Sequence, residues 1–183
     1  MGIQPKEFLD KLVVKGIITK QQATQHEVGS LKKEMPIDQY LLQYTNLDRE
    51  DIIKTKADLL NVAYVNMSTT AVDPQALALL PESVSKRHSI MPYMYDDKNK
   101  VLYVATSDPL NVSLQDFIEM KAGVRSVLAL ADSSDIAQII NLSYSKNISP
   151  EVEQAVAQAA PNGPKIKNSE KILDKSLTSA PIA

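Results

Sequence analysis

Near the middle of the chain, the segment Ser83-Val-Ser-Lys86 places a serine and a lysine at a spacing that some enzymes use for catalysis. A serine three residues ahead of a lysine is the arrangement that penicillin-binding enzymes use for acyl transfer. Those enzymes also carry S-D-N and K-T-G motifs, and only Ser134-Asp135 half matches either one. Serine and lysine one helical turn apart occur by chance on many helices, so we do not expect a serine nucleophile here.

Nucleotide hydrolysis and metal chemistry are also poorly supported. None of the five glycines opens a G-x-x-x-x-G-K-[ST] loop, so we expect no ATP hydrolysis by this chain itself. The chain has no cysteine, and its two histidines, His26 and His88, have no ligand-type neighbour one helical turn away. We expect no metal and no cofactor, with His26 on a solvated helix face and His88 at a helix end.

The composition is that of a near-neutral globular protein. The formal net charge is −2, and only three of the twenty basic residues are arginines, at positions 49, 87 and 125. This balance argues against a nucleic-acid partner. No apolar run is long enough to cross a bilayer, and the first residues lack a signal-peptide core, so we expect a cytoplasmic protein without direct membrane insertion.

Residues 1–61 are expected to form a helical subdomain. Leu12–Ala23 aligns with Leu41–Ile52 at an offset of 29 residues, and each copy is typical of a helix, a tight turn and a second helix. Gly16 suits the left-handed position after a helix. Thr19, with Gln22 three residues on, has capping-box spacing, and Asp48 is the matching N-cap of the second copy. The pattern predicts two helical hairpins, four helices in all.

Residues 62–145 are expected to form an α/β subdomain. Four runs rich in apolar and β-branched residues predict strands, and the intervening segments, with proline and N-cap signals, predict helices. Ile90–Tyr95 and Lys100–Ala105 flank the turn signal Asp96–Asn99, so they should form a hairpin. The other two runs are Val62–Met67 and Val124–Leu130. The sheet should be small and mixed or antiparallel, which makes the fold class α+β.

Residues 146–183 are expected to be a flexible linker or tail. No aromatic residue follows Tyr144, Ser149-Pro150 would start a short alanine-rich helix, and Pro161-Asn-Gly-Pro164 would end it. The remaining segment is polar and has few apolar residues to bury.

Several short segments occur in a characteristic order. They are Leu80-Pro81-Glu82, Lys86-Arg87, Met91-Pro92, Leu102-Tyr-Val-Ala-Thr-Ser-Asp-Pro-Leu110 and Val127-Leu-Ala-Leu130. With these segments, roughly residues 5–145 resemble the N-terminal domain of type II secretion and type IV pilus assembly ATPases, also called the MshE N-terminal domain. The strand followed by Ala-x-Ser-Asp-Pro-Leu is the most specific of them. The last residues, Ser176-Leu-Thr-Ser-Ala-Pro-Ile-Ala183, resemble the entry to the motor domain of the same ATPases.

The resemblance implies a function in a molecular machine. Such domains dock a cytoplasmic, hexameric motor onto inner-membrane platform or accessory proteins and can pass a signal to it. ATP and Mg would belong to a motor domain beyond this chain. As partner-binding residues we select Tyr40, Tyr44 and Arg49 on the helical subdomain, with the hairpin edge near Tyr93 and Tyr103 as a further surface.

Some members of this family bind cyclic di-GMP through two tandem motifs in the helical region. The family pattern is an R-L-G triplet, a leucine three residues on, a glycine four later, then spaced leucines and a glutamine. In the first copy Leu12 and Gly16 match, and in the second Leu41 and Ile52 match.

Both triplets depart from the pattern. They are Glu7-Phe8-Leu9 and Pro36-Ile37-Asp38, so neither copy has its arginine. In the first copy the carboxylate of Glu7 replaces the arginine that would contact a ligand phosphate, so attraction to the phosphate becomes repulsion. We therefore expect no tight binding of cyclic di-GMP. A cyclic di-GMP sensor with altered residues, and a stand-alone adaptor without a motor, remain the alternatives.

Overall fold

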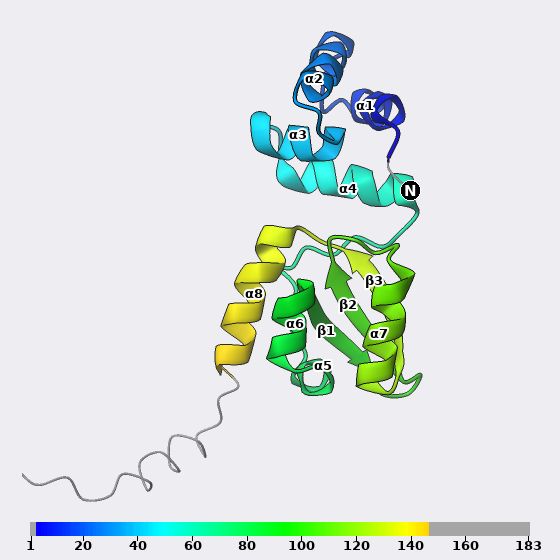
Figure 1. The fold of residues 1–183 in the computed structure, drawn as a ribbon, viewed down its shortest axis with the longest axis vertical. Coiled ribbons are helices and arrows are strands. Elements are labelled where there is room, and N and C mark those ends of the chain that lie inside the picture. The colour runs from blue at the N-terminus through cyan, green and yellow to red at the C-terminus, as the bar shows by residue number, and fades with distance from the viewer. Residues whose placement is uncertain (1–2, 147–183) are drawn as a thin grey trace, which may run out of the picture. The chain divides into compact units, whose positions relative to one another are not determined.

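The computed structural model describes residues 3–146, which form eight helices and one three-stranded sheet (Figure 1). The elements are α1 (Pro5–Val14), α2 (Lys20–Lys32), α3 (Ile37–Tyr44), α4 (Arg49–Leu60), α5 (Pro74–Leu79), α6 (Glu82–His88), β1 (Ile90–Asp96), β2 (Val101–Thr106), α7 (Val112–Ala122), β3 (Arg125–Leu130) and α8 (Ser133–Lys146). The predicted α+β class, with helices ahead of a small mixed sheet, is confirmed. The boundaries proposed at residues 61/62 and 145/146 stay predictions, and the proposed tail lies outside the described residues.

Helices α1 to α4 enclose one apolar core. Its buried members come from all four helices and the first turn: Phe8, Leu9, Leu12, Ile18, Ala23, Ile37, Leu41 and Ile52. In α1 and α3 the buried apolar side chains recur at three- and four-residue spacing, so one stripe of each of these helices faces inward, whereas α2 supplies only Ala23 to this core.

The predicted helix boundaries in this subdomain are confirmed. Thr19 and Gln22 form a capping box, with Gln22 N donating to Thr19 Oγ1 at 3.2 Å and Thr19 N donating to Gln22 Oε1 at 2.8 Å. Gly16 follows α1 with a φ of 72°, a conformation that an L side chain rarely adopts. Asp48 caps α4 by accepting from Glu50 N at 2.8 Å.

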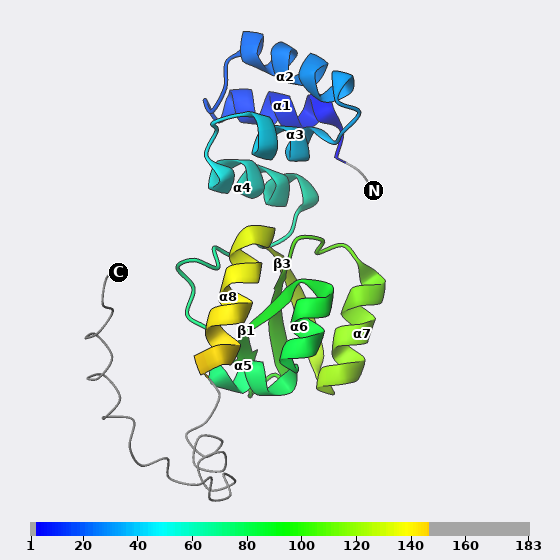
Figure 2. The same cartoon turned by 60° about the vertical axis from the view of Figure 1, so that its left-hand side comes forward.

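Strand β2 is the centre of the sheet, antiparallel to β1 and parallel to β3. The parallel pair is joined through α7, as a parallel connection requires. Leu102 and Val104 of β2 cluster with Leu128 of β3 and Ile118 of α7. Because side chains alternate along a strand, the neighbouring Ala105 points to the opposite side, where it clusters with α8 through residues such as Ile136. Figure 2 shows α8 lying beside α6, and the Tyr144 hydroxyl is 2.9 Å from Ser85 Oγ.

The prediction of a strand at Val62–Met67 is wrong. Within this segment only Tyr64 forms a bridge, parallel to Leu130, with Leu130 N donating to Ala63 O at 2.8 Å. The segment cannot extend because both ends turn away. Val62 N bonds back to the end of α4, and the Asn66 side chain accepts from Ser68 N at 3.0 Å in a local turn.

Hydrogen bonds from neighbouring segments engage backbone groups along both edges of the sheet. At β1, Asp73 N donates to Tyr93 O at 3.0 Å, and Tyr95 N donates to the Asp73 carboxylate at 3.3 Å. At β3, the Gln115 and Glu119 side chains of α7 bond to Ser126 O and Ser126 N at 2.9 and 2.8 Å. These backbone groups are therefore already engaged and are not free to pair with a strand of another protein.

Within the described part of the chain, every helix is too short or too polar to cross a bilayer.

Candidate functional site

Three of the four nucleotide-motif positions lie in the core of the helical subdomain. Leu12, Leu41 and Ile52 are at most 1% exposed, and all three belong to the apolar core that α1 to α4 enclose. Gly16 is the positive-φ residue after α1. In this conformation, the three apolar side chains stabilise the fold and have no surface on which a base could stack.

The two selected tyrosines differ in their surroundings. Tyr40 packs against the helical core and approaches Gly29 of α2 so closely that a Cβ there would overlap its hydroxyl. Tyr44 is 53% exposed, stacks on Tyr40 with ring centroids 5.5 Å apart, and lies under the Lys33 ammonium at 5.1 Å. Tyr44 therefore offers aromatic surface, whereas Tyr40 mainly fixes the α2–α3 contact.

Arg49, the third residue selected for partner binding, is held by an internal carboxylate. Its Nε donates to Asp132 Oδ2 at 2.7 Å and its Nη2 donates to Asp132 Oδ1 at 3.0 Å. Asp132 Oδ1 also accepts from Ser134 N at 2.8 Å, at the start of α8. The pair therefore ties the start of α4 to the start of α8, 83 residues away.

The surroundings of Asp132 favour its ionised form. Burial is the largest single influence and raises the pKa, but hydrogen bonds from Arg49 and Ser134 together hold the pKa of Asp132 below its usual value.

The hairpin edge near Tyr93 and Tyr103 is partly buried. The two rings are 6.3 Å apart, and Tyr93 packs against the cluster under α8. Burial raises the pKa of the Tyr93 hydroxyl. Because Asp73 already bonds to the backbone of Tyr93 and Tyr95 at this edge, a partner could contact only the side chains there.

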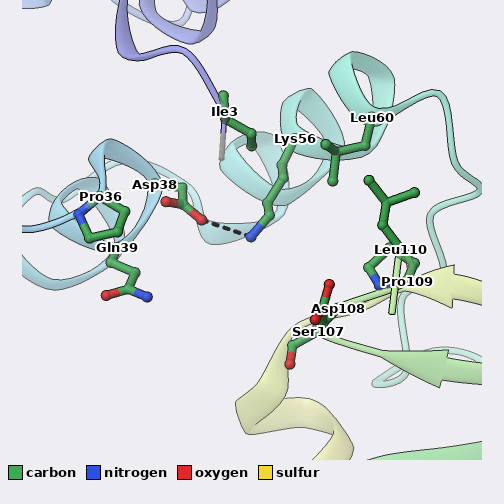
Figure 3. Close-up of a pocket in the computed structure, with 10 residues that line it drawn as sticks. All are labelled: Ile3, Pro36, Asp38, Gln39, Lys56, Leu60, Ser107, Asp108, Pro109 and Leu110. Atoms are coloured by element: carbon green, nitrogen blue, oxygen red, sulfur yellow. Dashed lines mark hydrogen bonds and ion pairs between the residues drawn. The ribbon is translucent and has the colours of Figure 1, made fainter. Parts of the chain in front are cut away.

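A hollow of about 530 Å³ lies between helices α3 and α4 and the loop after β2 (Figure 3). The lining residues are Ile3, Pro36, Asp38, Gln39, Lys56, Leu60, Ser107, Asp108, Pro109 and Leu110. We call it the α3–loop hollow. It includes Pro36 and Asp38 of the second motif triplet. Lys56 Nζ lies 2.7 Å from Asp38 Oδ2, so the one cationic side chain among the lining residues is paired with an acid.

A second groove, of about 350 Å³, lies between α1 and α2 beside the first motif copy. Lys6 and Lys20 line it together with Asp10 and Glu27, so its charges balance. Neither depression presents the guanidinium group that the family motif uses.

No catalytic arrangement is assembled at the positions flagged in the sequence. Lys86 pairs with Glu82 at 2.8 Å, and Ser85, rather than Ser83, bonds to Tyr144. His88 ends α6, as predicted, and its ring lies against Phe117, with the ring centroids 4.6 Å apart and the planes tilted by 43°.

His26 is half-buried against Tyr40, so a solvated face was the wrong expectation. Burial lowers its pKa. Among residues 3–146, no three histidine or acidic residues converge in a way that could hold a metal.

The Arg49–Asp132 pair and the α3–loop hollow were not predicted. The loop residues Ser107–Leu110 did stand out, but only as part of a family motif. Their facing residues on α3 and α4 come from a distant segment, and no local pattern joins the two.

A family model and solved structures match this chain. The model of the MshEN domain matches residues 60–149. Among solved structures, MshE with cdg has a TM-score of 0.57 at 20% identity, covering 73% of this chain and 96% of that chain. The N-terminal domain of XpsE has a TM-score of 0.51 at 16% identity, covering 77% of this chain and 97% of that one.

At 20% and 16% identity, the similarity to these two solved structures shows only that the fold is shared. A search of curated proteins found no significant match. Together with the fold, the match over residues 60–149 shows that the chain contains an MshEN domain, the N-terminal domain of type II secretion and type IV pilus assembly ATPases.

Proposed function

We propose that this chain is the docking and regulatory domain of a type IV pilus assembly or type II secretion motor. It couples a cytoplasmic, hexameric ATPase to inner-membrane platform or accessory proteins, and ATP and Mg belong to the motor domain. The MshEN match over residues 60–149 is the observation that carries this proposal.

The docking surface proposed is the outer face of α2 and α3 around Tyr44. Exposed tyrosines are favoured at protein interfaces because they combine apolar area with a hydroxyl group. Leu31, near the end of α2, is 69% exposed and adds apolar area to the same helix pair. Arg49 is a weaker choice than Tyr44, because binding a partner through it would require breaking its pair with Asp132.

The test measures binding of the purified chain to the soluble cytoplasmic domains of the platform and accessory proteins of the same machine. Tyr44→Ala should weaken the complex by about tenfold or more, as expected for an aromatic anchor. Met120→Ala is the matched control, because Met120 is an exposed apolar residue on α7. Absence of binding to every such domain, or equal loss in both variants, would argue against this docking surface.

The second candidate is a cyclic di-GMP sensor, and one observation favours it: the similar MshE structure contains cdg. The local chemistry opposes it. Glu7 and Pro36 stand at the two arginine positions, and Lys56, which lines the hollow beside the second triplet, is paired with Asp38. A dianionic ligand there would meet carboxylates without a free guanidinium group.

A further inference from the structure

The α3–loop hollow has the size of a ligand site. Its volume of about 530 Å³ falls within the range of small-molecule pockets. Figure 3 shows the Asp38–Lys56 pair on the helical wall and Asp108 on the loop wall. The hollow can therefore accept a group that reaches between the helices and the loop.

The charges lining the hollow select for a cation. Lys56 and Asp38 neutralise each other at 2.7 Å. Asp108 is exposed and makes no side-chain ion pair within residues 3–146. The remaining lining residues are uncharged, so the hollow carries one net negative charge. An anionic group would be repelled, whereas a cation would find an available carboxylate.

The loop fixes the backbone of Asp108 before any ligand arrives, so the position from which its carboxylate extends is set in advance. Asp108 N donates to Thr106 Oγ1 at 3.2 Å, and Asp108 O accepts from Asn111 N at 3.4 Å. The next residue, Pro109, is buried, and its ring limits the backbone to a narrow φ range. A ligand therefore needs to order little of the loop.

The rest of the lining suits an aliphatic stem. Ile3, Leu60 and Leu110 contribute apolar walls, with Pro36 and Pro109. A long basic side chain buries its methylene groups against such walls and keeps its charge at a polar end. Between the two basic residues, arginine has the planar fork that matches a carboxylate with two parallel hydrogen bonds.

We propose that the α3–loop hollow binds an arginine side chain presented by a partner protein, with Asp108 accepting the guanidinium hydrogen bonds. The stem lies along the apolar walls, and the Asp38–Lys56 pair stays intact. This inference does not depend on the partner's being a platform protein. Its test uses a small probe, so a failure here leaves the docking proposal standing.

The test follows amide resonances of the full chain during titration with Nα-acetyl-arginine amide. Saturable shifts are expected at Ser107, Asp108 and Leu110 at millimolar probe concentrations, because a single side chain has few contacts. The uncharged isostere Nα-acetyl-citrulline amide should bind about tenfold more weakly or not measurably, since it lacks the charge-assisted bond.

Two variants locate the site. Asp108→Asn keeps the shape of an exposed side chain but removes its charge, so it should reduce arginine binding by about tenfold. Asp116→Asn, an exposed acid on α7 that does not line the hollow, should bind as the unmodified chain does. Shifts at the three loop residues, lost in Asp108→Asn alone, would support the site. No saturable shift, equal binding of citrulline, or unchanged binding by Asp108→Asn would overturn it.

Discussion

At the scale of single residues, Asp132 links two helices that the chain places far apart. Its carboxylate binds Arg49 at the start of α4 and accepts from Ser134 N at the start of α8, although the side chain is only 8% exposed. A buried carboxylate is tolerated when such donors satisfy it, and removing one partner leaves the other uncompensated. Asp132 therefore contributes to stability mainly as an ion.

Replacing Asp132 with Asn should lower the free energy of unfolding at neutral pH by about 1–3 kcal/mol. The pKa of Asp132 is lowered in the folded chain, so its stabilising effect is fully present above the unfolded value of about 3.9. That effect is lost as the pH falls from there through the folded pKa.

Urea unfolding at neutral pH and at about pH 3 checks this prediction. The deficit of Asp132→Asn should shrink at the lower pH. The exposed control Asp116→Asn should show little deficit at either pH. An equal deficit of Asp132→Asn at both values would mean that the charge of Asp132 is not what stabilises the fold.

At the scale of helices and strands, close approach and edge protection depend on particular residues. The α2–α3 contact needs Gly29, because Tyr40 occupies the space that a Cβ would take. The edge of β3 needs α7, because two side chains of that helix bond to Ser126. Both features were invisible in the sequence, since each joins residues from different elements.

Gly29→Ala should lower the free energy of unfolding. The overlap with Tyr40 should cost about 1–3 kcal/mol. The higher helix propensity of alanine offsets about 1 kcal/mol of that cost. In a Tyr40→Ala background the overlap is gone, so the same Gly29→Ala change should become stabilising. A double-mutant cycle measured by urea unfolding gives both signs. If Gly29→Ala has the same effect in both backgrounds, Tyr40 is not the cause.

Glu119→Ala should lower stability by about 1–3 kcal/mol, because it leaves the buried Ser126 N–H without its acceptor. Glu119→Gln retains an acceptor oxygen and should recover most of the loss. Asp116→Ala, on the exposed side of the same helix, should change stability by no more than about 0.5 kcal/mol. Hydrogen exchange at the Ser126 amide should accelerate in Glu119→Ala alone. Unchanged exchange there would show that α7 does not protect this edge.

At the scale of the whole molecule, the sequence predicts features formed by adjacent residues but not contacts between distant segments. The Thr19 capping box and the Gly16 turn follow from a few adjacent residues, and the structure confirms both. The segment Val62–Met67 has strand composition, but turns at both ends leave it with one bridge. The Arg49–Asp132 pair spans 83 residues, so no periodicity could indicate it.

The same limit applied to function. The motif residues Leu12, Leu41 and Ile52 could be aligned with the family pattern, but only their burial shows that they belong to the core. Burial also limits attempts to restore the R-L-G triplet of the first copy by mutation. Leu9→Gly would remove a core side chain, so rebuilding the first triplet would be expected to cost stability.

Our proposal is that this MshEN domain binds proteins rather than a cyclic dinucleotide, and calorimetric titration with cyclic di-GMP distinguishes these two functions. Glu7 and Pro36 replace two arginines, each able to supply a charge-assisted hydrogen bond worth about 1.5–3 kcal/mol. Their loss should weaken binding by roughly two to four orders of magnitude if the two effects add. We predict no binding heat at micromolar concentrations. A sub-micromolar dissociation constant for the unmodified chain would contradict the proposed docking function and favour a nucleotide sensor.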